Sequence, residues 1–285
     1  MTLIYDEVMA TTVVDLPLSY SDTESILYAL SVGLGRHPLG PKELPYVYEH
    51  GTPLRTVPTF ASVLVPDMFP PDLGWDFSQV LHSEQRMHLY RPLPAAADLL
   101  INKRIVGAFD WGPRNGAVIL FEAEGRLASD DTVLFTLGST VMARGDGGFG
   151  GPMGKGPKPH RAPRREPDLS CDFETRKDQA LLFRLTGDRN PLHVDSALAA
   201  KAGFAAPILH GMCTYGIACH AILKTICDYD YTLIAGFEAR FSAPVLPGDT
   251  IRTDMWQDGN VISFRCTVKG RNSVVLRNGK CTLTV

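Results

Sequence analysis

The chain has 285 residues, of which 45% are hydrophobic and 21% charged, and its formal net charge is −3. This composition is typical of a soluble globular protein with one large domain or two ordinary ones, and the charge gives no reason to expect a nucleic-acid or acidic-membrane partner. The sequence shows no signal-peptide pattern, no stretch long enough to span a bilayer and no peroxisomal address, so we expect a cytoplasmic protein.

The first half of the chain predicts one helix followed by strands. A helical stretch begins after about Ser21, and alternating apolar runs follow near 80–90, 98–105, 117–124 and 132–142. These runs indicate a mostly antiparallel sheet. We therefore expect a first domain over residues 1–142.

A segment rich in Gly, Pro and basic residues comes next and predicts an interdomain linker over residues 143–168. Within it, residues 145–150 match the pattern G-x-G-x-x-G of dinucleotide sites. Gly151 and Pro152 follow and cannot open the helix that such a site requires, so we interpret the match as accidental. The basic residues of the linker are expected to be solvated.

The string Gly-Asp-Arg-Asn-Pro-Leu-His holds the most informative residues, because it places Asp188 and His193 five positions apart. Asn190 is a good N-cap and Pro191 suits the first position of a helix that we expect to run to Ala202. Both side chains can then face one cavity, where an Asp–His pair can take a proton from water and return one to a substrate. The spacing equally fits an Asx-turn before an ordinary capped helix, with His193 on its surface.

A second motif, Leu-His-Gly-Met, opens a stretch that is apolar on most faces as far as Ile226 and predicts a buried helix. The N-terminus of such a helix carries unpaired N–H groups and a partial positive charge. Gly211 has no side chain to shield its N–H, so this residue is a candidate oxyanion site. The alternative is a glycine that only allows close packing, with His210 as a hydrogen-bonded core histidine.

The rest of the second half predicts strands near 234–242, 250–256, 261–268 and 273–285, which gives a second domain over residues 169–285. Each half then consists of one long buried helix and a mostly antiparallel sheet, an α+β pattern. All six cysteines lie in the second half, without zinc-like spacing. We expect reduced thiols and no metal site.

The two halves also share a repeat. Short Pro-Leu and Leu-Pro strings around Pro38 and Pro94 recur 153 residues later, which suggests a duplicated domain. The alignment places Gly35 and Gly40 where the second half has its Asp and His, and Phe60 where it has its oxyanion glycine. The first half therefore lacks the acid–base pair, and we expect it to act as scaffold and to help form a cleft between the halves.

In these motifs the chain resembles the MaoC-like dehydratase, or enoyl-CoA hydratase 2, family. The resemblance rests on residues 183–193, on 207–212 and on the Pro-Gly-Asp segment within 240–249. The last of these is also found more widely in hot-dog proteins. Residues 1–142 resemble the degenerate N-terminal half of the two-domain members.

The resemblance implies a double hot-dog fold, with two mostly antiparallel sheets that each wrap a central helix. It implies reversible addition of water to a trans-2-enoyl-CoA, giving the (R)-3-hydroxyacyl-CoA, with Asp188 and His193 as the catalytic pair. Gly211, Asn190 and His210 are the implied oxyanion and substrate-binding residues. Two groups on one face favour syn addition. The reaction needs only the acyl-CoA and water, so we expect no cofactor.

Two other functions stay open at this point. A hot-dog thioesterase would direct water at the thioester carbonyl instead, and a non-catalytic acyl-CoA-binding subunit would leave the chemistry to a partner. Arg240 is a candidate contact for a CoA phosphate, although a solvated strand end explains it equally well. We also expect that a homodimer can form through the sheet edges.

Overall fold

The computed structural model describes residues 3–36, 40–50, 52–65, 74–75 and 79–284. Within these residues ten strands form one continuous antiparallel sheet, in the order β1-β3-β4-β5-β2-β7-β10-β9-β8-β6. The strands are β1 (Thr12–Tyr20), β2 (Val80–Leu89), β3 (Ala97–Asp110), β4 (Ala117–Leu127), β5 (Val133–Ala143), β6 (Leu169–Glu174), β7 (Ile234–Phe241), β8 (Thr250–Asp258), β9 (Val261–Val268) and β10 (Ser273–Leu283).

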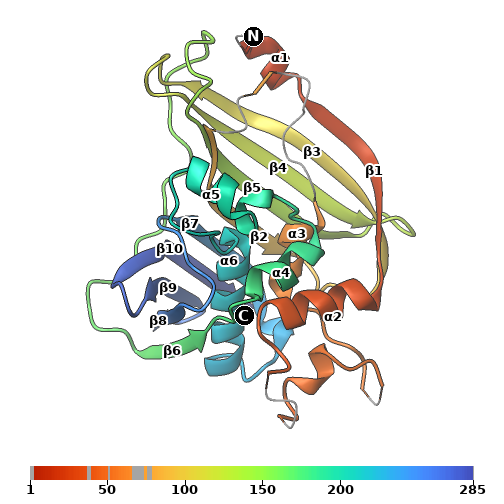
Figure 1. Ribbon diagram of the computed structural model, residues 1–285. Helices are drawn as coiled ribbons and strands as arrows, with labels where there is room; N and C mark the ends of the chain where they lie inside the picture. Colours follow the sequence, from red (N-terminus) through yellow and green to blue (C-terminus); the bar gives the residue numbers. More distant parts are fainter. Residues whose placement is uncertain (1–2, 37–39, 51, 66–73, 76–78, 285) are drawn as a thin grey trace.

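The helices gather on one side of this sheet, which we call its inner face (Figure 1). They are α1 (Tyr5–Met9), α2 (Asp22–Ser31), α3 (Ala61–Leu64), α4 (Gln179–Phe183), α5 (Ser196–Lys201) and α6 (Gly211–Thr225), with the short turns η1 (Leu44–Tyr46), η2 (Pro58–Phe60), η5 (Arg184–Thr186), η6 (Pro191–His193) and η7 (Tyr231–Leu233). The central residues of α6, Cys213 to Leu223, are all buried, as its apolar sequence predicts. Among the helices of the described residues, none has both the length and the apolarity to cross a membrane.

Strands β2 and β7 join the two halves edge to edge, with Glu84 opposite Arg240 and His88 opposite Gly236. The two sheets expected from the sequence are therefore five-stranded halves of one sheet. Glu84 is buried at this joint and forms ion pairs with both Arg86 and Arg240. A buried carboxylate needs such partners, because desolvation without them is costly.

The two halves differ in their helices. The helix expected after Ser21 in the first half is confirmed as α2, with Ser21 as its N-cap, but the described residues of that half have no counterpart of the long α6, since α3 spans only Ala61–Leu64. The backbone leaves the helical region at Val65, so the segment that follows η2 makes a single turn. The second half alone contains a long central helix, α6, within the described residues. The candidate site residues His210 and Gly211 lie at the N-terminus of this helix.

The expected linker is held against the sheet. The Asp110 carboxylate, at the end of β3, accepts hydrogen bonds from the N–H groups of Gly112, Gly148 and Gly150 at 2.7, 2.7 and 2.8 Å. The glycine-rich string thus surrounds a carboxylate of the protein itself, which agrees with our interpretation of the dinucleotide pattern as accidental. Further along, the Trp256 indole N–H donates to the carbonyl of Arg165 at 2.8 Å.

Candidate active site

Two successive side-chain caps shape the loop that carries Asp188. One carboxylate oxygen of Asp188 accepts the N–H of Asn190 at 3.0 Å, and the amide oxygen of Asn190 accepts the N–H of Leu192 at 3.0 Å. The first contact is the Asx-turn that the sequence allowed, and the second confirms Asn190 as an N-cap. The turn and the predicted catalytic position of Asp188 are therefore compatible.

The helix expected to continue to Ala202 is broken. The turn η6 ends at His193, and α5 begins at Ser196 with its own cap, Asp195, whose carboxylate accepts two N–H groups. The competing cap at Asp195 explains the break, because its side chain bonds N–H groups that a continuous helix would use. His193 consequently ends a single turn, and only 8% of its surface is exposed.

The tautomer of His193 follows from its partner. Its Nδ1 lies 2.8 Å from the carbonyl oxygen of Ile208, and a carbonyl can only accept, so Nδ1 carries the hydrogen. Burial lowers the pKa of His193, so the ring is neutral near pH 7 and Nε2 keeps its lone pair. This lone pair belongs to the nitrogen nearer to Asp188.

Asp188 and His193 face each other across a short gap. The distance between Nε2 of His193 and Oδ2 of Asp188 is 3.8 Å, which is too long for a direct hydrogen bond. One water at about 2.8 Å from each atom can bridge the pair. The Asp188 side chain is 44% exposed, so water and a ligand can reach the gap. The pair therefore has the geometry to hold a water between a carboxylate and an unprotonated imidazole.

His210 contacts both Asp188 and His193. Its ring stacks on that of His193 with centroids 3.6 Å apart, and the Phe183 ring lies 5.0 Å from its centroid. Its Nε2 donates to the main-chain carbonyl of Asp188 at 3.2 Å. Burial, reinforced by the nearby His193, lowers the pKa of His210 to about 4. His210 is thus a neutral and fully buried residue that touches both members of the pair.

Gly211 begins α6 immediately after His210. The first N–H groups of a helix have no acceptor within the helix, and the Gly211 N–H is one of them. The first N–H groups of α6 that bond a carbonyl of their own segment are those of Cys213 and Thr214, which both bond the carbonyl of His210. Gly211 is exposed, and a Cβ added there would lie 3.1 Å from the ring of Phe241. An oxygen can therefore approach this N–H, and a larger residue would crowd it.

Arg240 lies away from this group. It precedes Phe241 on β7, and because neighbouring residues of a strand point to opposite faces, the two side chains diverge. The Arg240 guanidinium forms its ion pair with the buried Glu84. The contact with a CoA phosphate stays a prediction, and the structure gives this cation an internal partner instead.

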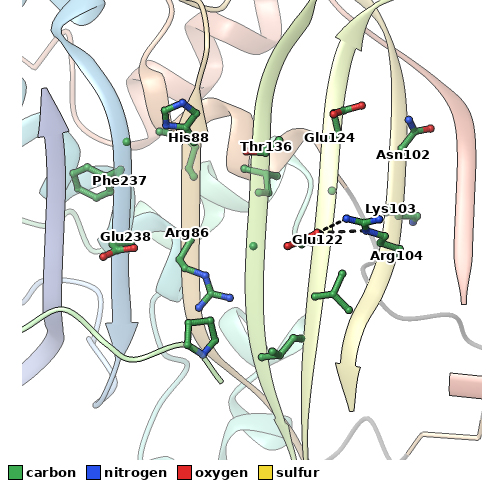
Figure 2. Close-up of a pocket in the computed structure, with 18 of the residues that line it drawn as sticks. Arg86, His88, Asn102, Lys103, Arg104, Glu122, Glu124, Thr136, Phe237 and Glu238 are labelled. Carbon is green, nitrogen blue, oxygen red and sulfur yellow. Dashed lines mark hydrogen bonds and ion pairs between the residues drawn. The ribbon is translucent and has the colours of Figure 1, made fainter. Parts of the chain in front are cut away.

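A groove of about 970 Å³ opens on the outer face of the sheet. Side chains of both charge signs line it, including Arg86, Arg104, Glu122, Glu124 and Glu238 (Figure 2). The buried residues that pack around α6 lie on the other face of the same strands. The groove is therefore separated by the sheet from Asp188 and His193 and is not the reaction site.

Asp188, His193 and His210 each offer a metal-ligand atom, and these atoms lie within 4.8 Å of one another. An ion needs the in-plane lone pairs of its ligands to converge on it. Stacked rings direct their lone pairs in nearly parallel directions, and each ring has one nitrogen hydrogen-bonded to a carbonyl. The arrangement suits proton transfer and fits a metal ion poorly.

Comparison with known families gives a match to each half. The family model described as MaoC like domain matches residues 158–278, and the model described as MFE-2 hydratase 2 N-terminal domain matches residues 18–145. The two models together cover most of the chain. The domain bounds predicted from the sequence, 1–142 and 169–285, stay predictions.

Relatives and solved structures agree with these matches. The enoyl-CoA hydratase ChsH3 of Mycobacterium tuberculosis is 38% identical over 268 residues, which cover 92% of each chain. The peroxisomal multifunctional enzyme type 2 of Mus musculus is 36% identical over 91% of this chain, which spans only 36% of that protein. The crystal structure of a MaoC-like dehydratase from Phytophthora capsici superposes with a TM-score of 0.85 at 28% identity, covering 98% of this chain and 97% of that one.

Proposed function

This chain belongs to the MaoC-like dehydratase family, in its two-domain enoyl-CoA hydratase 2 form, and we infer that it reversibly adds water to a trans-2-enoyl-CoA to give the (R)-3-hydroxyacyl-CoA. One observation carries the assignment of the site. The unprotonated Nε2 of His193 and the Asp188 carboxylate face each other across 3.8 Å. The pair lies next to His210, the residue before the first residue of α6.

The oxyanion site lies at the first residue of α6. Addition of water to a double bond conjugated with a thioester builds negative charge on the carbonyl oxygen. The Gly211 N–H, assisted by the positive end of a 15-residue helix, can bind that oxygen. Loss of one such donor typically costs about 3 kcal/mol of transition-state stabilisation. We therefore assign Gly211 the stabilisation of the enolate-like oxygen.

Asp188 and His193 transfer the protons of the reaction. The water oxygen forms a bond to C3 of the substrate, one water proton passes to the pair, and C2 takes up a proton from the pair, so that the net change is one added water. Because both groups lie on one side of the held water, the two additions occur on the same face of the double bond. Positioned acid–base groups of this kind typically contribute about 10²- to 10⁴-fold to a rate.

Asn190 and His210 position the pair in this account. The cap that Asn190 provides to η6 fixes the turn between the two catalytic residues. His210 is fully buried, so we assign it to the support of His193 and of the Asp188 carbonyl, and not to direct contact with the thioester as the sequence suggested. Oxygen binding is left to Gly211.

The proposed reaction adds water without any change of oxidation state overall, so we propose that it uses no cofactor beyond the CoA of its own substrate. We also propose a cytoplasmic location, although some relatives are named as peroxisomal. A homodimer through the outer edges β1 and β6 is a further proposal. Size-exclusion chromatography with light scattering tests the last point.

Purified protein with crotonyl-CoA tests the function. Loss of the enoyl absorbance together with formation of (R)-3-hydroxybutyryl-CoA supports hydration. Release of free CoA thiol without a hydroxyacyl product would identify a thioesterase. Binding of crotonyl-CoA without any product would identify a non-catalytic acyl-CoA-binding subunit.

A further inference from the structure

His82 of β2 reaches the inner face of the sheet because of a bulge. In the pairing of β2 with β5, His82 lies opposite Val141 and Glu84 lies opposite Thr140, so Ser83 is an extra residue. A regular strand would place His82 on the same face as Glu84. The bulge turns it to the opposite face, and bulges of this kind often aim a side chain at an active site.

On that face His82 approaches the start of α6. Its ring centroid lies 4.9 Å from that of Phe241, the residue whose ring crowds Gly211. Its Nε2 donates to the main-chain carbonyl of Glu84 at 3.0 Å, which fixes the orientation of the ring. Thus Phe241 connects a histidine of the first half with the oxyanion glycine of the second half.

The surroundings of His82 are those of a residue that lines a binding site. The residue is exposed to solvent, yet enough protein surrounds the ring that desolvation lowers its pKa, against the opposing hydrogen bonds to Glu84 and Gln85 and the weaker attraction of the Asp188 carboxylate. A side chain on a convex surface would be accessible without this desolvation. His82, Asp188 and Gly211 are all exposed, so a ligand can reach each of them.

We propose that His82 is a substrate-positioning residue that the first half contributes to the site, where its ring contacts the thioester end of the acyl-CoA beside the Gly211 N–H. This inference rests on the proposed function. It gives the first half a direct part in binding, even though Gly35 and Gly40 leave that half without an acid–base pair. The evidence for this role is the bulge in β2, and no pattern in the sequence predicted that bulge.

His88 provides a matched control. It is the same residue type on the same strand, but it lines the groove on the outer face (Figure 2). His82→Phe keeps an aromatic ring and removes the polar atoms. For crotonyl-CoA we expect KM to rise roughly 3- to 10-fold, the size of one lost hydrogen bond, with kcat within about twofold. His88→Phe should leave both constants within about twofold.

A binding measurement separates contact from a general structural effect. In ¹³C-histidine-labelled protein, the imidazole signal that disappears in His82→Phe should shift when (R)-3-hydroxybutyryl-CoA is added, and should not shift with CoA alone. The His88 signal should stay in place in both titrations. His82→Gln, which keeps a donor for the Glu84 carbonyl, should recover part of the lost KM.

Opposite results overturn the proposal. These are a KM for His82→Phe equal to that of the wild type, a His82 signal indifferent to the product, or equal effects of the substitutions at His82 and His88. Failure of the proposed function is recognised separately, because the wild-type protein itself would then give no hydration of crotonyl-CoA.

Discussion

The imidazole rings of His193 and His210 lie face to face, with planes inclined by only 28°. Two positive charges at this distance would repel strongly in a buried site, so the rings cannot both be protonated at moderate pH. His210 has the deeper burial and the pKa lowered to about 4. The stack therefore stays neutral near pH 7 and leaves the Nε2 lone pair of His193 free to act as a base.

The stack predicts a loss of stability in mild acid. The pKa of His210 is depressed in the folded state, so as pH falls below about 6.5 the unfolded chain binds the proton first. The neutral His210 ring therefore makes its full contribution to the free energy of unfolding above about pH 6.5. That free energy falls by about 3 kcal/mol by the time the pH reaches about 4. Urea unfolding at a series of pH values measures this loss.

His210→Phe is the matched variant for this measurement, because it keeps a ring against His193 and Phe183 and removes the titrating group. We expect its unfolding free energy to fall less steeply between about pH 6.5 and pH 4 than that of the wild type. Parallel curves for the two proteins would show that His210 does not carry the effect.

Substitutions at the pair should abolish catalysis and spare the fold. Asp188→Asn keeps the acceptor for the Asn190 N–H but loses the negative charge, and His193→Ala loses the base. We expect each to lower kcat/KM for crotonyl-CoA by roughly 10³-fold while the protein stays folded. Tm should change little for Asp188→Asn and should fall for His193→Ala, which loses a buried ring and its hydrogen bond to Ile208. Asp195→Asn is the control, because it changes a nearby carboxylate to another good N-cap and should leave turnover unaltered.

Gly211→Val should remove the oxyanion contact. The added Cβ would lie 3.1 Å from the Phe241 ring, and the branched side chain would cover the N–H. We expect a fall in kcat of about 10²-fold or more. Gly270→Val has open space around the added Cβ and serves as the comparison in the same steady-state assay. An active Gly211→Val enzyme would show that this N–H does not bind the thioester oxygen.

The first half should resist conversion into a second site. Gly35→Asp with Gly40→His, placed in the Asp188→Asn background, restores both residue types at the aligned positions. Gly35 has a φ of +77°, which favours glycine, and its N–H already donates to Glu43 at 2.9 Å. Phe60 also fills the aligned oxyanion position with a buried ring. We expect no hydration above the Asp188→Asn background, and recovery of the wild-type rate would refute this account.

Sequence reasoning located eight of the strands, because apolar alternation marks strands with one buried face. It missed β1 and β6, which are the two edges of the sheet and whose residues are mostly exposed or half-buried. Edge strands carry little apolar pattern, and β1 also contains Pro17 and Asp15 with a φ of +56°. Their strand character becomes clear only in the structure, where β1 pairs with β3 and β6 pairs with β8.

The turn and the cap in the loop at residues 188–193 could be predicted because they are local in sequence. Asp188, Asn190 and His193 share one loop, and capping rules apply to it directly. The support of that loop could not be predicted, since the His193 ring bonds the carbonyl of Ile208 outside the loop. The bulge in β2 that turns His82 to the inner face could not be predicted either. These contacts depend on strand register and side-chain packing, which the spacing of residues in the sequence does not reveal.

The central claim is that Asp188 and His193 jointly activate the water that adds to an enoyl thioester. Its most direct test is the rate at which wild-type, Asp188→Asn and His193→Ala proteins form (R)-3-hydroxybutyryl-CoA from crotonyl-CoA, with chiral analysis of the product. We predict rapid formation of the (R)-product by the wild type and a loss of roughly 10³-fold in both variants. A variant within about tenfold of the wild-type rate, or a wild type that forms the (S)-product, would contradict the account.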